Sequence, residues 1–198
     1  MKATIRTQKA FLYLKARQQS MKRIIVSFSV LILSFALFSQ SYTPVDQGSR
    51  VHFVIDNFGI ATGGDFKGLS GTIKFDPANL AASDFDVSID ANTIDTDIEA
   101  RDNHLRKAEY LDVNTYPKIS LKSTRITKTN KDGYLYMFAN ITIKGVSKEI
   151  KFPFTATAKN GGYLFEGSFK LNRRDFGVGK SSISLSDDLT VSLSVFAK

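Results

Sequence analysis

The chain has 198 residues and a formal net charge of +8, and it contains neither cysteine nor tryptophan. Without cysteine there are no disulfides, so the fold must rely on its core, and a lipoprotein anchor, which needs a cysteine at the cleavage site, is excluded. Of the 27 Lys and Arg residues, 7 precede Tyr42, whereas all 19 acidic residues follow it. Residues 42–198 are therefore almost neutral, which gives no reason to expect nucleic-acid binding.

The N-terminal segment has the pattern of a targeting sequence. Residues 1–20 are basic and contain no acidic residue, and we interpret them as a leader or as the product of an over-extended start. Residues 21–41 are typical of a secretory signal peptide, because a basic start precedes an apolar run over 24–38 and a small-x-small site at 39–41. A membrane-spanning helix needs roughly 20 apolar residues, more than this run contains. A buried core helix or a retained anchor is the alternative interpretation.

The signal peptide predicts an exported protein, periplasmic in a two-membrane bacterium or otherwise secreted. Its mature part would be residues 42–198, with no stable membrane insertion. The length of this part favours a single domain.

Beyond residue 42 apolar and polar residues alternate in short runs, the two-residue period of half-buried β-strands. Turn signals separate the runs, among them Asn130–Gly133 and Asn160–Gly162. The predicted strands are 50–57, 63–75, 84–90, 118–128, 134–144, 149–159, 162–170 and 181–197. Antiparallel strands joined mostly by short turns predict an all-β fold, and both a closed barrel and a sandwich fit the pattern.

Residues 93–117 interrupt the alternation with a charged, helix-compatible stretch that ends at Tyr116-Pro117. We expect a short helical insert around residues 96–111, with Asp95 or Thr96 capping the helical turn. Side chains expected against the barrel are Ile98, Leu105 and Tyr110. Those expected to face outward or reach over the barrel mouth are Glu99, Arg101, Asp102 and Arg106.

The alternation also gathers apolar side chains on one face of the strands. A sandwich would use that face for packing, whereas a barrel of about eight strands can hold one elongated ligand inside. The side chains predicted to line such a pore are Val51, Phe53, Ile55, Ile73, Phe75, Val87, Ile89, Ile119, Leu121, Ile141, Ile143, Phe152, Phe154, Phe165 and Phe169.

Catalytic patterns have little support. The two histidines, His52 and His104, lie on different segments, and neither belongs to a zinc-binding pattern. His52 alternates with inward residues, so we expect it to be an ordinary surface histidine. There is no G-x-S-x-G motif and no P-loop, and acid pairs such as Asp187-Asp188 are expected to be solvated loop residues. The sequence therefore predicts a protein that is not an enzyme and requires no cofactor or metal.

Several motifs follow one another along the mature chain. They are Gly64-Asp65-Phe66, Leu69 to Pro77 (LSGTIKFDP), Asp90 to Thr96 (DANTIDT), Arg101 to Leu105 (RDNHL), Tyr116-Pro117, Ile141 to Lys148 (ITIKGVSK) and Asn172 to Val178 (NRRDFGV). In this order and spacing residues 42–198 resemble the YceI-like family of exported polyisoprenoid-binding proteins. The resemblance implies an extended, eight-stranded, antiparallel, lipocalin-like barrel with helical excursions around an apolar pore. It also implies that a long-chain isoprenoid, of the isoprenoid quinone or polyprenyl phosphate type, is bound for transport or storage.

We expect the ligand head group to be held near the barrel mouth by Asn57, Arg101, His104 and Arg173. An arginine can donate two parallel hydrogen bonds to a phosphate. Position 57 carries Asn where many relatives have His, so a role of that histidine is not carried over. For Arg173 the competing interpretation is a structural tie to Asp175 that braces a turn, with a positive φ at Gly177.

Two other functions stay open. One is a non-binding structural or interaction β-module of the cell envelope, whose apolar face is all core. The other is a hydrolase or isomerase of a lipid head group, for which no nucleophile–base pair is visible. The native lipid and the oligomeric state, a homodimer included, are not determined by the sequence.

Overall fold

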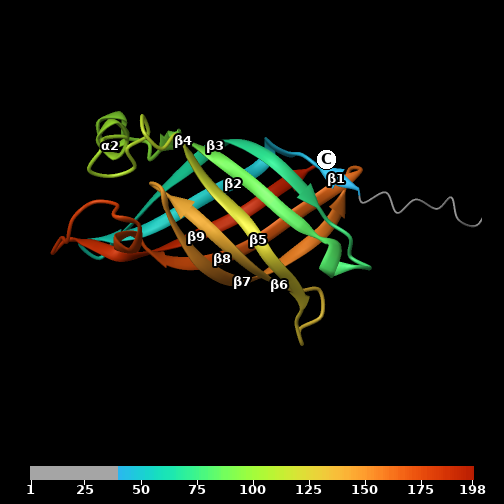
Figure 1. Cartoon of the computed structure of the whole chain (residues 1–198). Coiled ribbons are helices and arrows are strands. Elements are labelled where there is room, and N and C mark those ends of the chain that lie inside the picture. The colour runs from blue at the N-terminus through green and yellow to red at the C-terminus, as the bar shows by residue number, and fades with distance from the viewer. Residues whose placement is uncertain (1–39) are drawn as a thin grey trace, which may run out of the picture. The chain divides into compact units, whose positions relative to one another are not determined.

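The computed structural model describes residues 40–198, so the predicted leader and nearly all of the predicted signal peptide lie outside the described residues. Strands dominate the described part of the chain (Figure 1). They are β1 (Ser41–Tyr42), β2 (Pro44–Asn57), β3 (Ile60–Lys74), β4 (Asp84–Asp95), β5 (Lys118–Lys128), β6 (Leu135–Ile143), β7 (Val146–Lys159), β8 (Gly162–Asn172) and β9 (Leu185–Ala197). The helical segments are η1 (Leu80–Ala82), α2 (Glu99–Leu105) and η2 (Arg173–Phe176).

Strands β2 to β9 form a closed antiparallel barrel. Each pairs with its neighbour in sequence, and the pairing of β9 with β2 closes the barrel. The short β1 pairs with β3 outside this circuit. The predicted eight-stranded barrel is confirmed, and the sandwich is excluded.

The ends of several strands differ from the prediction for local reasons. β9 begins at Leu185 instead of residue 181, because the Ser182 hydroxyl accepts the N–H groups of Ser184 and Leu185 and holds them in a turn. β2 begins at Pro44, and the alternation missed its first part because the pairing register shifts between Val45 and Arg50.

Strands β3 and β4 meet at an irregular seam that explains the glycine in the LSGTIKFDP motif. The pairing register shifts twice along this seam. Gly71 has a φ of 114°, and a Cβ atom there would lie 2.1 Å from the carbonyl oxygen of Asp86 on the neighbouring strand. Only glycine fits this conformation and this close approach. Just upstream, the Asp46 carboxylate accepts the N–H groups of Gly68 and Leu69 and stabilises the bend.

One end of the barrel is filled by aromatic rings, which we call the aromatic plug: Tyr42, Phe75, Phe85, Phe154, Tyr163 and Phe165. Ring centroids lie 5.3 Å apart for Phe75 and Phe165, and 5.0 Å apart for Phe85 and Phe165, both in edge-to-face geometry. The four phenylalanines of the plug are each at most 6% exposed. Because Tyr42 belongs to β1 and Phe75 and Phe85 flank η1, the plug lies at the end of the barrel that holds β1 and the C-terminus, away from α2 (Figure 1). It therefore closes one end of the barrel and leaves the other end for a site.

Candidate functional site

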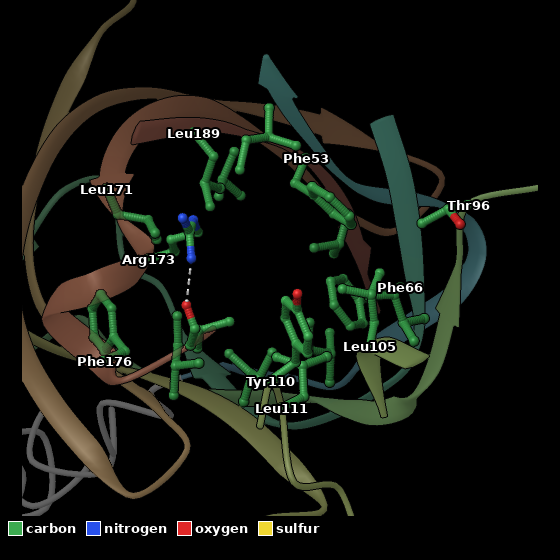
Figure 2. A pocket seen from close by; sticks show the side chains of 18 of the residues that line it. Phe53, Phe66, Thr96, Leu105, Tyr110, Leu111, Leu171, Arg173, Phe176 and Leu189 are labelled. Carbon is green, nitrogen blue, oxygen red and sulfur yellow. Dashed lines mark hydrogen bonds between the residues drawn. The ribbon is translucent and has the colours of Figure 1, made fainter. Parts of the chain in front are cut away.

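The half of the barrel toward α2 and η2 encloses a cavity of about 650 Å³ (Figure 2). Its wall is mostly aliphatic and aromatic. The predicted pore residues that line it are Val51, Phe53, Ile55, Val87, Ile89, Ile119, Leu121, Ile141, Ile143 and Phe169. Further apolar side chains complete the wall, among them Phe66, Ile94, Leu105, Leu171, Phe176, Leu189, Val191, Leu193 and Val195. Those on β9 follow the same alternation as the predicted set, so the signal that identifies them was present in the sequence.

Five side chains predicted for the pore do not line the cavity: Ile73, Phe75, Phe152, Phe154 and Phe165. They point into the core, where each is at most 6% exposed. Phe152 packs on Phe169 of the cavity wall, with the two ring centroids 4.8 Å apart. Alternation identifies inward side chains correctly, but only in one half of the barrel is the interior left open.

The insert between β4 and β5 covers the cavity mouth with Leu105, Tyr110 and Leu111. Figure 2 shows the hydroxyl of Tyr110 turned toward the open centre. The expected contacts of Leu105 and Tyr110 are therefore present. Ile98, expected against the barrel, is instead 51% exposed.

The N-terminus of α2 is organised differently from the prediction. The N-cap residue is Ile98, whose side chain makes no capping hydrogen bond, so neither Asp95 nor Thr96 caps the helix. Instead the Thr96 N–H and hydroxyl both donate to Oδ1 of Asp102, the former at 2.9 Å. Asp102, expected to face outward, is 6% exposed. A carboxylate at the fourth helical position thus fixes the segment before the helix.

Arg101 and His104 both line the cavity, one helical turn apart on α2. Arg101 donates from Nε to the Thr96 hydroxyl at 2.7 Å and from Nη2 to the Thr96 carbonyl. Arginine has five N–H groups, and the remaining three of Arg101 have no hydrogen-bond partner within residues 40–198. His104 is exposed and packs on Tyr110, with ring centroids 4.8 Å apart. This side of the mouth can contact an anionic or carbonyl head group.

Arg173 lies on the opposite side of the cavity mouth and is only 3% exposed (Figure 2). Its guanidinium donates to the carbonyls of Ser186, Val178 and Lys180, each at 2.9 Å. It also forms an ion pair of 2.6 Å with Asp187. The structural tie is therefore present, but its partner is Asp187, and Asp175 is exposed. Gly177 has the expected positive φ, 66°.

Asn57, the remaining predicted head-group residue, also lines the cavity. It is half-buried at the end of β2, where its backbone pairs with Leu185 of β9 and Ile60 of β3. The four predicted head-group residues are thus all brought to one mouth, although they come from three separate segments. Lys180, Ser182 and Ser184 also line the cavity, and no pattern in the sequence indicated that they would.

Residues 42–197 match the YceI-like domain family along their whole length. The chain belongs to the YceI-like family. A YceI protein of Salmonella arizonae is 30% identical over 189 residues, which cover 88% of this chain and 97% of that protein. A UPF0312 protein of Enterobacter is 32% identical over 156 residues, covering 75% of this chain and 80% of the relative.

Solved structures share the YceI-like fold. BcnA of Burkholderia cenocepacia superposes with a TM-score of 0.73 at 24% identity, covering 78% of this chain and 99% of BcnA. A polyisoprenoid-binding domain from Saccharophagus degradans, implicated in plant cell wall breakdown, gives a TM-score of 0.65 at 15% identity and covers 79% of this chain and 97% of that domain. Both similarities establish the barrel fold.

Residues 40–198 of this YceI-like chain contain neither a metal-binding cluster nor a membrane-spanning helix. No three His, Asp or Glu side chains gather there in a way that could hold a metal ion. No helix in that range is long and apolar enough to cross a membrane.

Outside the barrel the YceI-like chain carries a charged cluster formed by Arg50, His52 and Asp65. Asp65 accepts two hydrogen bonds from Arg50, at 2.8 and 2.9 Å, and lies 3.0 Å from Nδ1 of His52. His52 was expected to be an ordinary surface histidine, and it is instead hydrogen-bonded within this cluster. Hydrogen bonds from Arg50, and secondarily from His52, hold the pKa of the Asp65 carboxyl below its ordinary value. The cluster joins β2 to β3 beside Gly63 and Gly64, and so supports the wall on which Phe53 lies.

The lowered pKa of Asp65 predicts an acid-dependent loss of stability. A carboxyl whose pKa is lower in the folded state stabilises the protein above the unfolded-state pKa, about 3.9, and that contribution is lost as pH falls through the folded pKa. We expect Asp65→Asn to lower the melting temperature at neutral pH and to weaken the decline in stability below about pH 4. Thermal unfolding measured by circular dichroism across this range checks it. Asp132→Asn, in the exposed β5–β6 turn, is the control, and an identical pH profile for both variants would contradict the prediction.

Proposed function

We propose that this YceI-like protein binds a long-chain isoprenoid in the barrel cavity and holds it for transport or storage. The observation that carries the proposal is the apolar cavity, open toward the α2 and η2 end and closed by the aromatic plug at the other. A cavity of this size and lining is typical of small-molecule sites. The polyisoprenoid-binding domain that shares the fold supports an isoprenoid as the ligand class.

The cavity volume limits the length of the buried tail. If a methylene-sized group takes about the volume of a liquid water molecule, about 30 Å³, then 650 Å³ holds roughly 20 such groups, or about four isoprene units. Their burial gives a gross of about 16 kcal/mol, from which association subtracts about 4–15 kcal/mol. Micromolar affinity corresponds to about −8 kcal/mol and is within this range. Longer tails would extend out through the mouth.

The head group would meet Arg101, His104 and Tyr110. Arg101 has N–H groups free of other partners in the described chain and can donate to a phosphate, or to a quinone carbonyl. The guanidinium of Arg173 is occupied by three carbonyls and Asp187, which favours a structural role for it. The tail would provide most of the affinity, and the head group the specificity.

The cellular setting that we propose is outside the cytoplasm. The signal-peptide pattern of residues 21–41 supports export, and a carrier in the periplasm would move a lipid tail through water that the tail does not cross alone. Binding, and not catalysis, is the activity that the site supports. The alternative, a structural module, requires that the whole inward face be packed, and the cavity weighs against it.

Native mass spectrometry of the protein purified from its own host without detergent tests this function. We expect a stoichiometric adduct that extraction identifies as a prenyl lipid, and a higher melting temperature when the lipid is bound, since a ligand that binds only the folded state stabilises it. An unmodified mass that stays unchanged after incubation with prenyl quinones and polyprenyl phosphates would support the structural module instead.

A further inference from the structure

Large apolar side chains are exposed at one end of the barrel. Among residues 40–198 the exposed large apolar side chains are Phe58, Ile60, Ile98, Val146 and Ile183. All belong to loops and strand ends on the side of the cavity mouth. Three of them are the most exposed: Phe58 is 75% exposed, Ile60 is 68% exposed and Ile183 is fully exposed. We call these three the apolar tip.

The two loops that carry the apolar tip are joined. Phe58 is in the β2–β3 turn, and its N–H donates to the carbonyl of Ser184 at 2.8 Å, one residue after Ile183. Residues 57–64 of the first loop and residues 181–186 of the second contain no charged side chain. The tip is therefore one continuous, uncharged and apolar projection formed by two distant parts of the sequence.

The turn at Phe58 suggests a function other than folding. Phe58 and Gly59 have φ values of 55° and 76°, as in a type I′ hairpin turn, whose first position favours Asn, Asp or Gly. The left-handed conformation is costly for a bulky residue. The exposed ring makes little contact that would offset this cost. A strained residue that the fold does not need is a reason to look for a partner outside the molecule.

The apolar tip is also continuous with the cavity. Asn57, Thr62, Ser182, Ser184 and Leu185, which flank the three tip residues in sequence, line the cavity. A ligand that leaves the cavity on this side would pass along the tip. A tail could then move between the cavity and an apolar medium without crossing water.

We propose that the apolar tip inserts into the surface of a lipid bilayer and that the ligand enters and leaves the cavity there. This inference rests on the proposed function, and it identifies the lipid bilayer as the source of the isoprenoid ligand. Three projecting side chains are far from the roughly 1,200 Å² that a stable protein–protein interface buries, whereas apolar side chains suffice for reversible insertion into a bilayer surface. Because the tip has no charge, insertion does not require anionic lipids.

A single tryptophan reports insertion directly, because the chain has none of its own. In Ile183→Trp we expect the indole emission to shift to the blue on addition of phosphatidylcholine vesicles and to be quenched when the acyl chains are brominated. The control is Tyr134→Trp, in the β5–β6 turn at the plug end, next to Leu135, which pairs with Phe154. Its emission should not change, even if another part of the chain holds the protein on the vesicle.

Three results would overturn the proposal. They are emission from Ile183→Trp that ignores vesicles, emission that responds only to anionic vesicles at low salt, and a blue shift that grows with protein concentration without vesicles. The second would indicate electrostatic attachment, and the third would indicate a second copy of the chain on the tip.

A second variant links the tip to ligand transfer. Phe58→Asn with Ile183→Ser is expected to slow the uptake of geranylgeraniol from phosphatidylcholine vesicles by at least about tenfold per removed side chain. The thermal stabilisation given by geranylgeraniol added from ethanol should stay unchanged. An unchanged transfer rate overturns the membrane inference alone, whereas no stabilisation of the wild type by any prenyl compound would count against the proposed function even if the tip inserts.

Discussion

Phe53→Asp is expected to lower the affinity for prenyl lipids by at least about 100-fold, because a carboxylate in an apolar cavity loses its hydration without gaining a partner. Phe53 lies on the cavity wall, with its ring centroid 5.7 Å from that of Phe66 (Figure 2). A Cβ on Gly64 would lie 2.7 Å from the Phe53 ring, so the ring rests directly on the backbone of β3. This position leaves a substituted carboxylate facing the space where the tail would bind. Isothermal titration with geranylgeraniol, or the thermal shift that it causes, measures the effect.

Val54→Asp is the matched control for Phe53→Asp. Val54 is the next residue on β2, is partly buried and does not line the cavity. The control should bind the lipid as the wild type does, while both variants keep the circular dichroism spectrum of the barrel. Equal affinity of a folded Phe53→Asp variant and the wild type would mean that the cavity is not the binding site.

Arg173→Met is expected to lower the free energy of unfolding by about 3 kcal/mol, since it leaves three carbonyls and the Asp187 carboxylate without their donor. At this chain length the melting temperature should fall by about 6–12 °C. The bonds of Arg173 tie η2 to the segment that leads into β9, and so shape one side of the cavity mouth. Arg173→Lys should recover little, because an ammonium cannot reproduce the planar arrangement of donors. Chemical denaturation provides the measurement.

Arg174→Met separates this loss from the general effect of removing an arginine. The Arg174 side chain is exposed and makes no hydrogen bond within residues 40–198. Only its backbone does, because its N–H donates to Oδ1 of Asn172 and its carbonyl accepts from Gly177. We expect almost no change in its stability. If Arg173→Met were instead as stable as the wild type but no longer bound the lipid, Arg173 would belong to the head-group site.

Family motifs account for much of what was predictable. Glycine is required at position 71, where β3 pairs with β4, and at position 177, in the turn after η2. The backbone conformation therefore explains why each of these two motifs contains a glycine. The insert was also predictable in type, because residues 99–105 lack strand alternation and form a helix. The hydrogen-bond partners of Asp102 and Arg173 were not predictable from the sequence. Thr96 and Asp187 are two among many polar residues nearby in the chain, and no sequence pattern distinguishes them.

The strands and the inward side of each strand follow from the order of residues alone, because a two-residue period is a local property of the backbone. Whether an inward side chain meets another side chain or faces open space depends on what the other strands contribute at the same height in the barrel. Phe75 and Phe165 are far apart in the chain, yet their rings pack together and fill one end. Phe53 and Leu121 follow the same alternation but line the cavity. Phe58 and Ile183 form one apolar tip for the same reason, because the closure of β9 onto β2 brings their loops together.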